Sequence, residues 1–300
     1  MPPAKALLLR AAALPLALLA ACVAPPPATP PPSGEAAAIE ANRRADAYLR
    51  SGDLESAARQ YREAVRLARS VEDAESIAAN AINLSIVYQR LGRADDARAA
   101  LALLLERGQL PYSSERMAQA ALRRSVLDLE ERRSASANEW LERAAAYCGQ
   151  RGCAVSSAIQ NVRGQLALEA GRLDQAGASA KAALSASRSS GDRAETANAL
   201  RLLGTVSTRT GDAGTAATYL AEALAIDREL AAPHKIYLDL MALGRASALR
   251  GDRPAARSFY ERARAVSEAD RDAEGAAQAR ALIDALGDNV QARQPAPGRP

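Results

Sequence analysis

The sequence has few of the residues that build catalytic and metal sites. In 300 residues it contains one histidine, three cysteines, one tryptophan and one phenylalanine. These are too few ligands for a conventional zinc or haem site, and a single histidine without a surrounding motif provides no Ser-His-Asp triad. The sequence therefore predicts no metal, no cofactor and no enzyme.

Net charge is also low. Lys and Arg total 39 against 35 Asp and Glu, a formal charge of +4. We expect residues 1–21 to be removed, and the loss of Lys5 and Arg10 leaves +2. A charge this close to neutral does not support nucleic-acid binding.

Hydrophobic residues are plentiful, at 48%, although aromatic residues are only 3%. The chain can therefore bury a core, built mostly from Ala, Leu, Val and Ile. Because Ala and Leu favour helix, this composition points to an all-α protein.

The first 21 residues have the layout of a signal peptide, with Lys5 and Arg10 before an apolar run that ends at Ala21. The run is too short for a spanning helix. It ends in Leu19-Ala20-Ala21-Cys22, which resembles the bacterial lipobox. That resemblance implies cleavage before Cys22 and lipidation of its sulfur. The alternative is ordinary secretory cleavage nearby, with Cys22 incidental.

Residues 22–37 follow as the lipidated cysteine and a proline-rich linker, with six prolines from Pro25 to Pro32. Within it, residues 23–34 are a stiff polyproline spacer of at most roughly 40 Å. The residue after Cys22 is Val23, not Asp. By resemblance to Gram-negative lipoproteins, this implies an outer-membrane anchor with the folded part in the periplasm.

The rest of the chain repeats itself with a period near 40 residues. Turn glycines recur at Gly52, Gly92, Gly171, Gly211 and Gly251, and two periods within the long gap place the missing marker at Arg132. The fifth residue after every marker is Ala, and the seventh before every marker is Ala, Ser or Gly. The ninth after is mostly large. Small residues at fixed steps let two helices approach closely.

This pattern resembles the tetratricopeptide repeat, a helix-turn-helix unit, over about residues 38–268. The resemblance implies a right-handed α-solenoid of about six repeats. We expect a solenoid over 38–287 with a capping helix near 270–286 and a disordered tail over 288–300. The expected first helices cover residues 38–51, 73–91, 113–131, 153–170, 192–210 and 233–250.

The sequence departs from the family pattern in two ways. The family period is 34, so a period of 40 predicts longer helices and a groove that cannot be copied from a relative. The third repeat has Glu131-Arg132-Arg133 where the others have a turn glycine.

Two cysteines, Cys148 and Cys153, lie between the third and fourth repeats. In an oxidising periplasm a structural disulfide is the simplest interpretation. The alternatives are free thiols or a redox pair, which the spacing of four intervening residues does not favour.

Other conspicuous side chains have ordinary interpretations. His234 follows Pro233 at an expected helix start, where it would be exposed and without a role. Trp140, Tyr219, Phe259 and Tyr260 occupy packing positions of the repeat, so we expect them in the core.

In the tetratricopeptide family the first helices line an inner groove that binds partners. The chaperone-binding subclass needs several lysines there, and the mature chain has only Lys181 and Lys235. Amide and Arg side chains suit recognition of an extended backbone, because an amide both donates and accepts. Carried over to this sequence, the partner-binding positions are Asn42, Asp46, Gln89, Gln119, Asn161, Gln165, Asn198, Arg201, Thr205, Thr208 and Arg245. The alternative is that many of them are simply solvated.

These features lead to one hypothesis and two rivals. The hypothesis is a noncatalytic adaptor, anchored to the outer membrane, that binds protein or peptide partners for envelope assembly, secretion or cell-wall enzyme control. The rivals are a homo-oligomeric scaffold and a regulator or enzyme with an unrecognised site. Fold alone does not decide among them.

Overall fold

A computed structural model describes residues 33–106, 110–150 and 152–291. This part of the chain is entirely helical, with no strand. The helices are α1 (Gly34–Ser51), α2 (Leu54–Ser70), α3 (Ala74–Arg90), α4 (Ala94–Leu105), α5 (Ser114–Glu130), α6 (Ser134–Cys148), α7 (Ser156–Glu169), α8 (Leu173–Ser190), α9 (Arg193–Arg209), α10 (Ala213–Glu229), α11 (Pro233–Leu249), α12 (Arg253–Ala269) and α13 (Ala273–Gln291).

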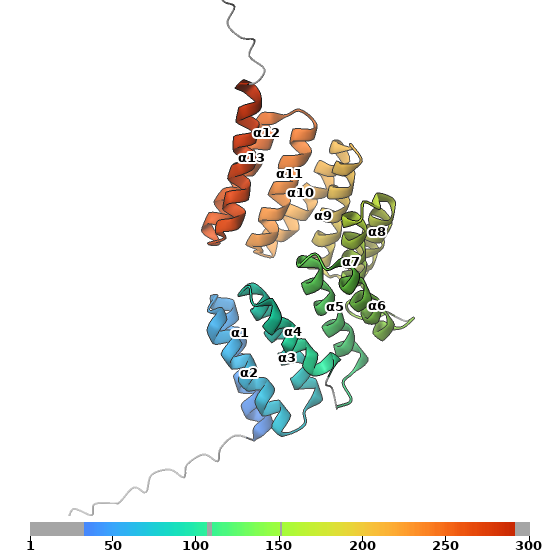
Figure 1. Cartoon of the computed structure of the whole chain (residues 1–300), viewed down its shortest axis with the longest axis vertical. Coiled ribbons are helices and arrows are strands. Elements are labelled where there is room, and N and C mark those ends of the chain that lie inside the picture. Colours follow the sequence, from blue (N-terminus) through green and yellow to red (C-terminus); the bar gives the residue numbers. More distant parts are fainter. Residues whose placement is uncertain (1–32, 107–109, 151, 292–300) are drawn as a thin grey trace, which may run out of the picture.

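The helices stack in chain order along an arc, with α1 and α13 on one side and α6 and α8 on the opposite side (Figure 1). Each helix packs on the next, and each odd-numbered helix up to α9 also contacts the next odd-numbered one. The pairs α1–α2 to α11–α12 are the six expected repeats, and α13 packs on α12. The predicted solenoid with a capping helix is confirmed.

The ends of the array differ slightly from the expected bounds. Helix α1 begins at Gly34 instead of residue 38, because the Ser33 hydroxyl accepts the Ala36 N–H at 3.2 Å and caps the helix. The helical cap runs to Gln291, so residues 288–291 continue α13 and are not part of the tail. The signal peptide, Cys22 and most of the proline-rich linker lie outside the described residues, as does the tail from residue 292.

Two devices recur in the turns within the six pairs: a glycine with positive φ in five of them, and an Asp cap in three. A glycine with positive φ closes the first helix of a pair, as at Gly52 (φ 81°) and Gly211 (φ 87°). An Asp at the next position then accepts the backbone N–H three residues on, as Asp53 does from Ser56 and Asp212 from Thr215, both at 3.0 Å.

The small residues before each turn let the paired helices touch. A Cβ on Gly204 would overlap Leu220, and a Cβ on Gly244 would overlap the ring of Tyr260. The alanines five residues after the markers, Ala57, Ala97, Ala137, Ala176, Ala216 and Ala256, are all 0% exposed. The repeat positions found in the sequence are therefore the contacts between helices.

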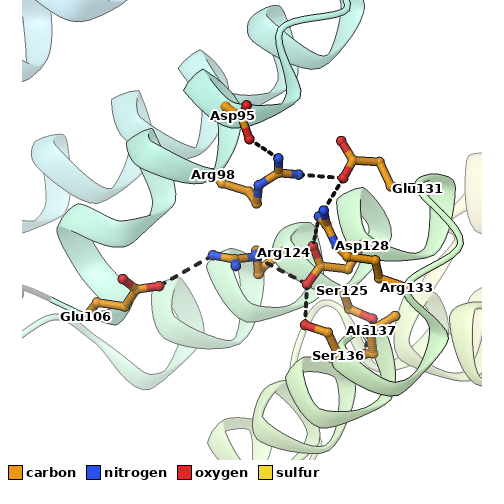
Figure 2. A network of polar contacts seen from close by, with 10 residues as sticks. All are labelled: Asp95, Arg98, Glu106, Arg124, Ser125, Asp128, Glu131, Arg133, Ser136 and Ala137. Atoms are coloured by element: carbon orange, nitrogen blue, oxygen red, sulfur yellow. Dashed lines mark hydrogen bonds and ion pairs between the residues drawn. The ribbon is translucent and has the colours of Figure 1, made fainter.

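The third repeat makes the same turn without glycine. Arg132 takes a φ of 59°, and the Arg133 N–H donates to the Asp128 carbonyl at 2.8 Å, as Asp53 does to Tyr48 in the first repeat. The fully buried Asp128 carboxylate accepts from Ser136 at 2.6 Å and from Arg133 (Figure 2). Arg124 lies 3.4 Å from the same carboxylate. This network stabilises a turn that lacks the usual glycine.

The aromatic side chains pack as expected. Trp140 and Tyr260 are buried, and the partly buried Tyr219 and Phe259 pack against the core. The guanidinium groups of Arg124 and Arg143 lie over the Trp140 ring, 5.3 and 4.4 Å from its centroid.

Cys148 and Cys153 are joined by a disulfide between the end of α6 and the start of α7, with their Cα atoms 5.0 Å apart. The Ser156 hydroxyl accepts the Cys153 N–H at 2.8 Å and donates to the Cys153 carbonyl at 2.7 Å.

Among the described helices none is long and apolar enough to cross a membrane.

Candidate partner-binding groove

A groove of about 1260 Å³ runs across the odd-numbered helices of four successive repeats. Its walls come from α5, α7, α9 and α11, with further residues from the α5–α6 turn. These are first helices of their pairs, which is where the sequence places the partner-binding face. The four helices converge on one groove because each odd-numbered helix stacks beside the next.

One half of the groove carries most of its apolar side chains, along with the charged Arg123, Glu130, Arg132 and Glu169. The apolar side chains are Leu122, Val126 and Leu129 from α5, Val155 just before α7, and Ala158, Val162 and Leu166 from α7. Several of these are largely buried, such as Leu122 at 7% and Val162 at 6% exposed. This half offers a shallow apolar floor on which an aliphatic side chain of a partner could pack.

The other half is polar and is built from α7, α9 and the first turn of α11. Asn161 donates from Nδ2 to the Glu195 carboxylate at 2.6 Å and to its carbonyl at 3.1 Å. Asn198 donates to the same carboxylate at 3.2 Å and accepts from Arg201 at 2.9 Å. These bonds fix the amides before any partner arrives, so the polar half is preorganised.

Three of the predicted partner-binding residues, Asn161, Gln165 and Asn198, line this groove. Gln165 is exposed and Asn198 half-buried, whereas Asn161 is only 3% exposed. Gln165 and Asn198 are therefore the two predicted residues that a partner could contact most easily.

The remaining predicted positions lie on odd-numbered helices outside the groove, and most bind the protein itself. Asn42 donates to Asn80 at 2.6 Å, Asp46 accepts from Tyr61, and Gln119 accepts from Arg116 at 2.8 Å. Gln89 donates to Glu130 at 2.5 Å. Thr205 and Thr208 donate to carbonyls of their own helix at 2.9 Å, and Arg245 is exposed on α11.

Arg201 was predicted to bind a partner, but in the structure it binds two carboxylates of the protein itself. Its guanidinium binds the Asp239 carboxylate at 2.6 Å and also that of Asp227, and both carboxylates are buried. It therefore joins α9, α10 and α11 beneath the groove and is not free for a partner.

The pKa of Asp239 is raised to about 7, mainly by burial and to a smaller extent by the nearby Asp227, against the opposing effect of Arg201. The second oxygen of Asp239, Oδ2, is buried and has no hydrogen-bond donor. Burial also lowers the pKa of Lys235, a partly buried residue one helical turn earlier on α11.

The charged side chains of the groove act on one another only from a distance, as Glu130 does on Arg123 and Glu195 on Lys235. Seven charged residues line it: Arg123, Glu130, Arg132, Glu169, Glu195, Arg209 and Lys235. Within the described residues, none of the seven takes part in an ion pair of 4.0 Å or less. Elsewhere on this solenoid ion pairs between helices are common, for example Arg98–Glu131 and Arg116–Glu75.

Sequence reasoning missed several groove residues. His234, expected to be an idle surface residue, is exposed but lies on the rim of the groove beside Lys235. Glu195 and Lys235 were also missed, because both lie near helix starts, outside the offsets carried over from the family. The signal that could have found them is the register of α9 and α11: Glu195 precedes Asn198 by three residues, and Lys235 precedes Asp239 by four.

In the described part of the chain no three His, Cys, Asp or Glu side chains are placed to hold a metal ion. The groove thus offers apolar contact, fixed amides and unpaired charges, which are the means of binding an extended chain.

The sequence matches a family model, described as tetratricopeptide repeat, over residues 35–109 and 155–229. The two matches cover half of the chain. The chain belongs to the tetratricopeptide repeat family. Proteins of this family act in protein–protein interaction, and their repeat fold is generally a noncatalytic scaffold. No curated protein matches the sequence.

Solved structures share this tetratricopeptide fold at low identity. A Rap protein complexed with Competence and Sporulation Factor is 14% identical, with a TM-score of 0.61 over 85% of this chain and 71% of that one. BtubC from P. vanneervenii is 18% identical, with a TM-score of 0.53 over 90% and 96%. PilW, a type IV pilus biogenesis factor, is 17% identical, with a TM-score of 0.53 over 80% and 97%. At this level of identity the likeness concerns the fold alone.

Proposed function

We propose that this protein is a noncatalytic adaptor of the bacterial cell envelope. The groove across α5, α7, α9 and α11 holds an extended segment of a protein partner, and a lipid on Cys22 holds the chain at the outer membrane, facing the periplasm. In this role the protein serves envelope assembly, secretion or control of cell-wall enzymes.

The observation that carries the proposal is that the charged side chains of the groove have no ion-pair partner in the described part of the chain. Seven charged side chains of both signs gather there without an ion pair among the described residues, beside an apolar floor and fixed amides. A partner segment with apolar and charged side chains would satisfy all three features at once. The neighbouring structure of a Rap protein with Competence and Sporulation Factor is one case of a related fold in a complex.

The binding part of the proposal can be tested by photocrosslinking in cells. A photoreactive amino acid replaces Gln165 or Asn198 in the full chain, and Gln175 on α8 or Glu261 on α12, both exposed, serve as controls. We expect crosslinked partners from the two groove positions and several-fold fewer from the controls. Equal labelling from all four positions would remove the groove from the proposal, and products containing only this chain would support a homo-oligomeric scaffold instead.

The anchoring part rests on Leu19-Ala20-Ala21-Cys22 and Val23, and it has its own test. We expect the natural chain to accumulate as an uncleaved precursor in cells treated with globomycin and otherwise to sediment with outer membranes. A Cys22→Ser chain should incorporate no labelled fatty acid. Recovery of the natural chain in the cytosol would contradict this part while leaving the groove proposal intact.

A further inference from the structure

The polar cluster beneath the groove contains more acid than base. Charged groups from three helices form this cluster: Arg201 from α9 and Asp227 from α10 act on Asp239, and Glu195 from α9 together with these three acts on Lys235 of α11. When all are ionised, three carboxylates face two cations. The only guanidinium of the cluster already binds two carboxylates. Such a surplus of buried negative charge is unfavourable unless a proton or a further cation neutralises it.

The geometry marks where that neutralisation occurs. Asp239 is 0% exposed, and its Oδ1 accepts from Arg201 while its Oδ2 has no donor. Asp227 shares the same guanidinium, so a proton on one carboxyl can be shared with the other. When neither carboxyl holds that proton, Oδ2 of Asp239 is left to be neutralised by a second cation.

Lys235 is positioned to be that cation. It precedes Asp239 by four residues on α11, so the two side chains project from the same face of the helix. No ion pair joins them within 4.0 Å in the described structure, and Lys235 instead lines the groove. A lysine side chain is long and flexible enough to turn from one place to the other.

We infer that a single proton on Asp239 decides whether the Lys235 ammonium faces the groove or forms an internal ion pair. With the proton present, Arg201 and Asp227 balance each other and Lys235 offers its charge to the groove. With the proton absent, the additional buried charge draws Lys235 inward to Oδ2. That this regulates partner binding rests on the proposed function, but the movement of Lys235 does not.

The pKa of Asp239, which burial raises to about 7, places the change near neutral pH. The groove would therefore present one more positive charge below neutral pH than above it. A partner segment that brings an acidic side chain to this end of the groove would bind more tightly as pH falls from about 8 to about 6.

The reactivity of Lys235 toward an amine reagent tests the switch without a partner. The full chain contains only Lys5, Lys181 and Lys235, and Lys181 is exposed on α8, where it provides an internal reference. Wild type and Asp239→Asn are labelled briefly with N-hydroxysuccinimidyl acetate from pH 6 to 8.5. Mass spectrometry of the peptides then gives the labelling of Lys235 relative to Lys181.

The asparagine matches a protonated carboxyl in size and charge, so wild type and variant should label alike at pH 6. We expect wild-type labelling of Lys235 to fall to about one third of the variant's at pH 8.5, because an ion pair keeps the amine protonated and buried. A quotient of wild type to variant that stays near 1 across the whole range would overturn the inference.

A second variant keeps the test decisive if Asp239→Asn does not fold by circular dichroism. Asp227→Asn leaves Arg201 to Asp239 alone, so the decrease in Lys235 labelling should move to lower pH. An unchanged profile in this variant would also overturn the inference. If crosslinking finds no partner while the labelling shows its decrease, the proposed function fails and the switch stands.

Discussion

The ring of Tyr260 occupies the space that a Cβ on Gly244 would need, so α11 and α12 touch at this point without a side chain between them. Tyr260 is 3% exposed and is held on its other sides by the core of the last repeat. The ring therefore has little room to move.

Gly244→Ala should lower the free energy of unfolding by about 1–3 kcal/mol, because overpacking outweighs the better helix propensity of alanine. Urea denaturation followed by circular dichroism measures the change. The matched control is Gly177→Ala on α8, where the new Cβ would lie 3.8 Å from Val206. That control should gain up to about 1 kcal/mol, and a loss equal to that of Gly244→Ala would contradict the explanation.

The turn of the third repeat offers a stabilising change. Arg132 has a φ of 59°, a conformation that glycine adopts without strain. Arg132→Gly should raise the thermal midpoint, with a gain of about 1 kcal/mol. The reverse change, Gly211→Ala, places alanine at a φ of 87° with open space around it and should lose about as much. If Arg132→Gly and Gly211→Ala changed stability in the same direction by the same amount, backbone strain would be excluded as the cause.

Asp128 should make the protein sensitive to acid. Burial opposes its ionisation, but hydrogen bonds from Ser136 and Arg133 outweigh burial and lower its pKa. A lowered pKa contributes stability that is present above the unfolded value near 3.9 and is lost as pH falls below it. Asp128→Asn should cost about 1–3 kcal/mol at pH 7 and progressively less below pH 4. Unfolding midpoints of both proteins at pH 3 and pH 7 provide the measurement.

Asp239 should affect the pH dependence of stability in the opposite direction to Asp128. Its pKa is raised to about 7, so the folded state holds a proton that the unfolded state has already released above about pH 4. Its contribution to stability is present below pH 4 and is lost as pH rises to 7. The stability of Asp239→Asn relative to wild type should therefore increase between pH 4.5 and pH 8. A relative stability that does not change with pH would show that the carboxyl is not perturbed.

The Cys148–Cys153 pair can be checked directly by mass spectrometry. Alkylation with iodoacetamide should leave both thiols unmodified before reduction and modify both after it. Cys148→Ser combined with Cys153→Ser should lower stability by about 2 kcal/mol, the chain-entropy estimate for so short a loop. Full alkylation of protein extracted from its natural host without a reductant would mean that the thiols are free.

Much of the fold could be predicted because the repeat is encoded by residue size at fixed offsets. The turn glycines, the small residues before them and the alanines after them mark where helices end and touch, which depends on local sequence. The exact ends of α1 and α13 were harder to predict. The start of α1, for example, depends on a single hydroxyl, that of Ser33.

The groove was predicted only in part. Carrying family offsets onto the sequence found Asn161, Gln165 and Asn198, which depend on helix register alone. It assigned Arg201 to a partner because no pattern within one helix shows that Asp227 and Asp239, 26 and 38 residues later, reach the same guanidinium. Lys235 and His234 enter the groove because the array curves, and curvature depends on packing between repeats.

The amino-acid order by itself determined the helical class and the number of repeats, because these follow from local spacing and side-chain volume, and the family resemblance indicated which helix of each pair faces inward. Only the tertiary structure decided which inward residues share a groove and which are used to hold the repeats together. Those outcomes depend on distances between residues far apart in the chain, and stacking sets these distances.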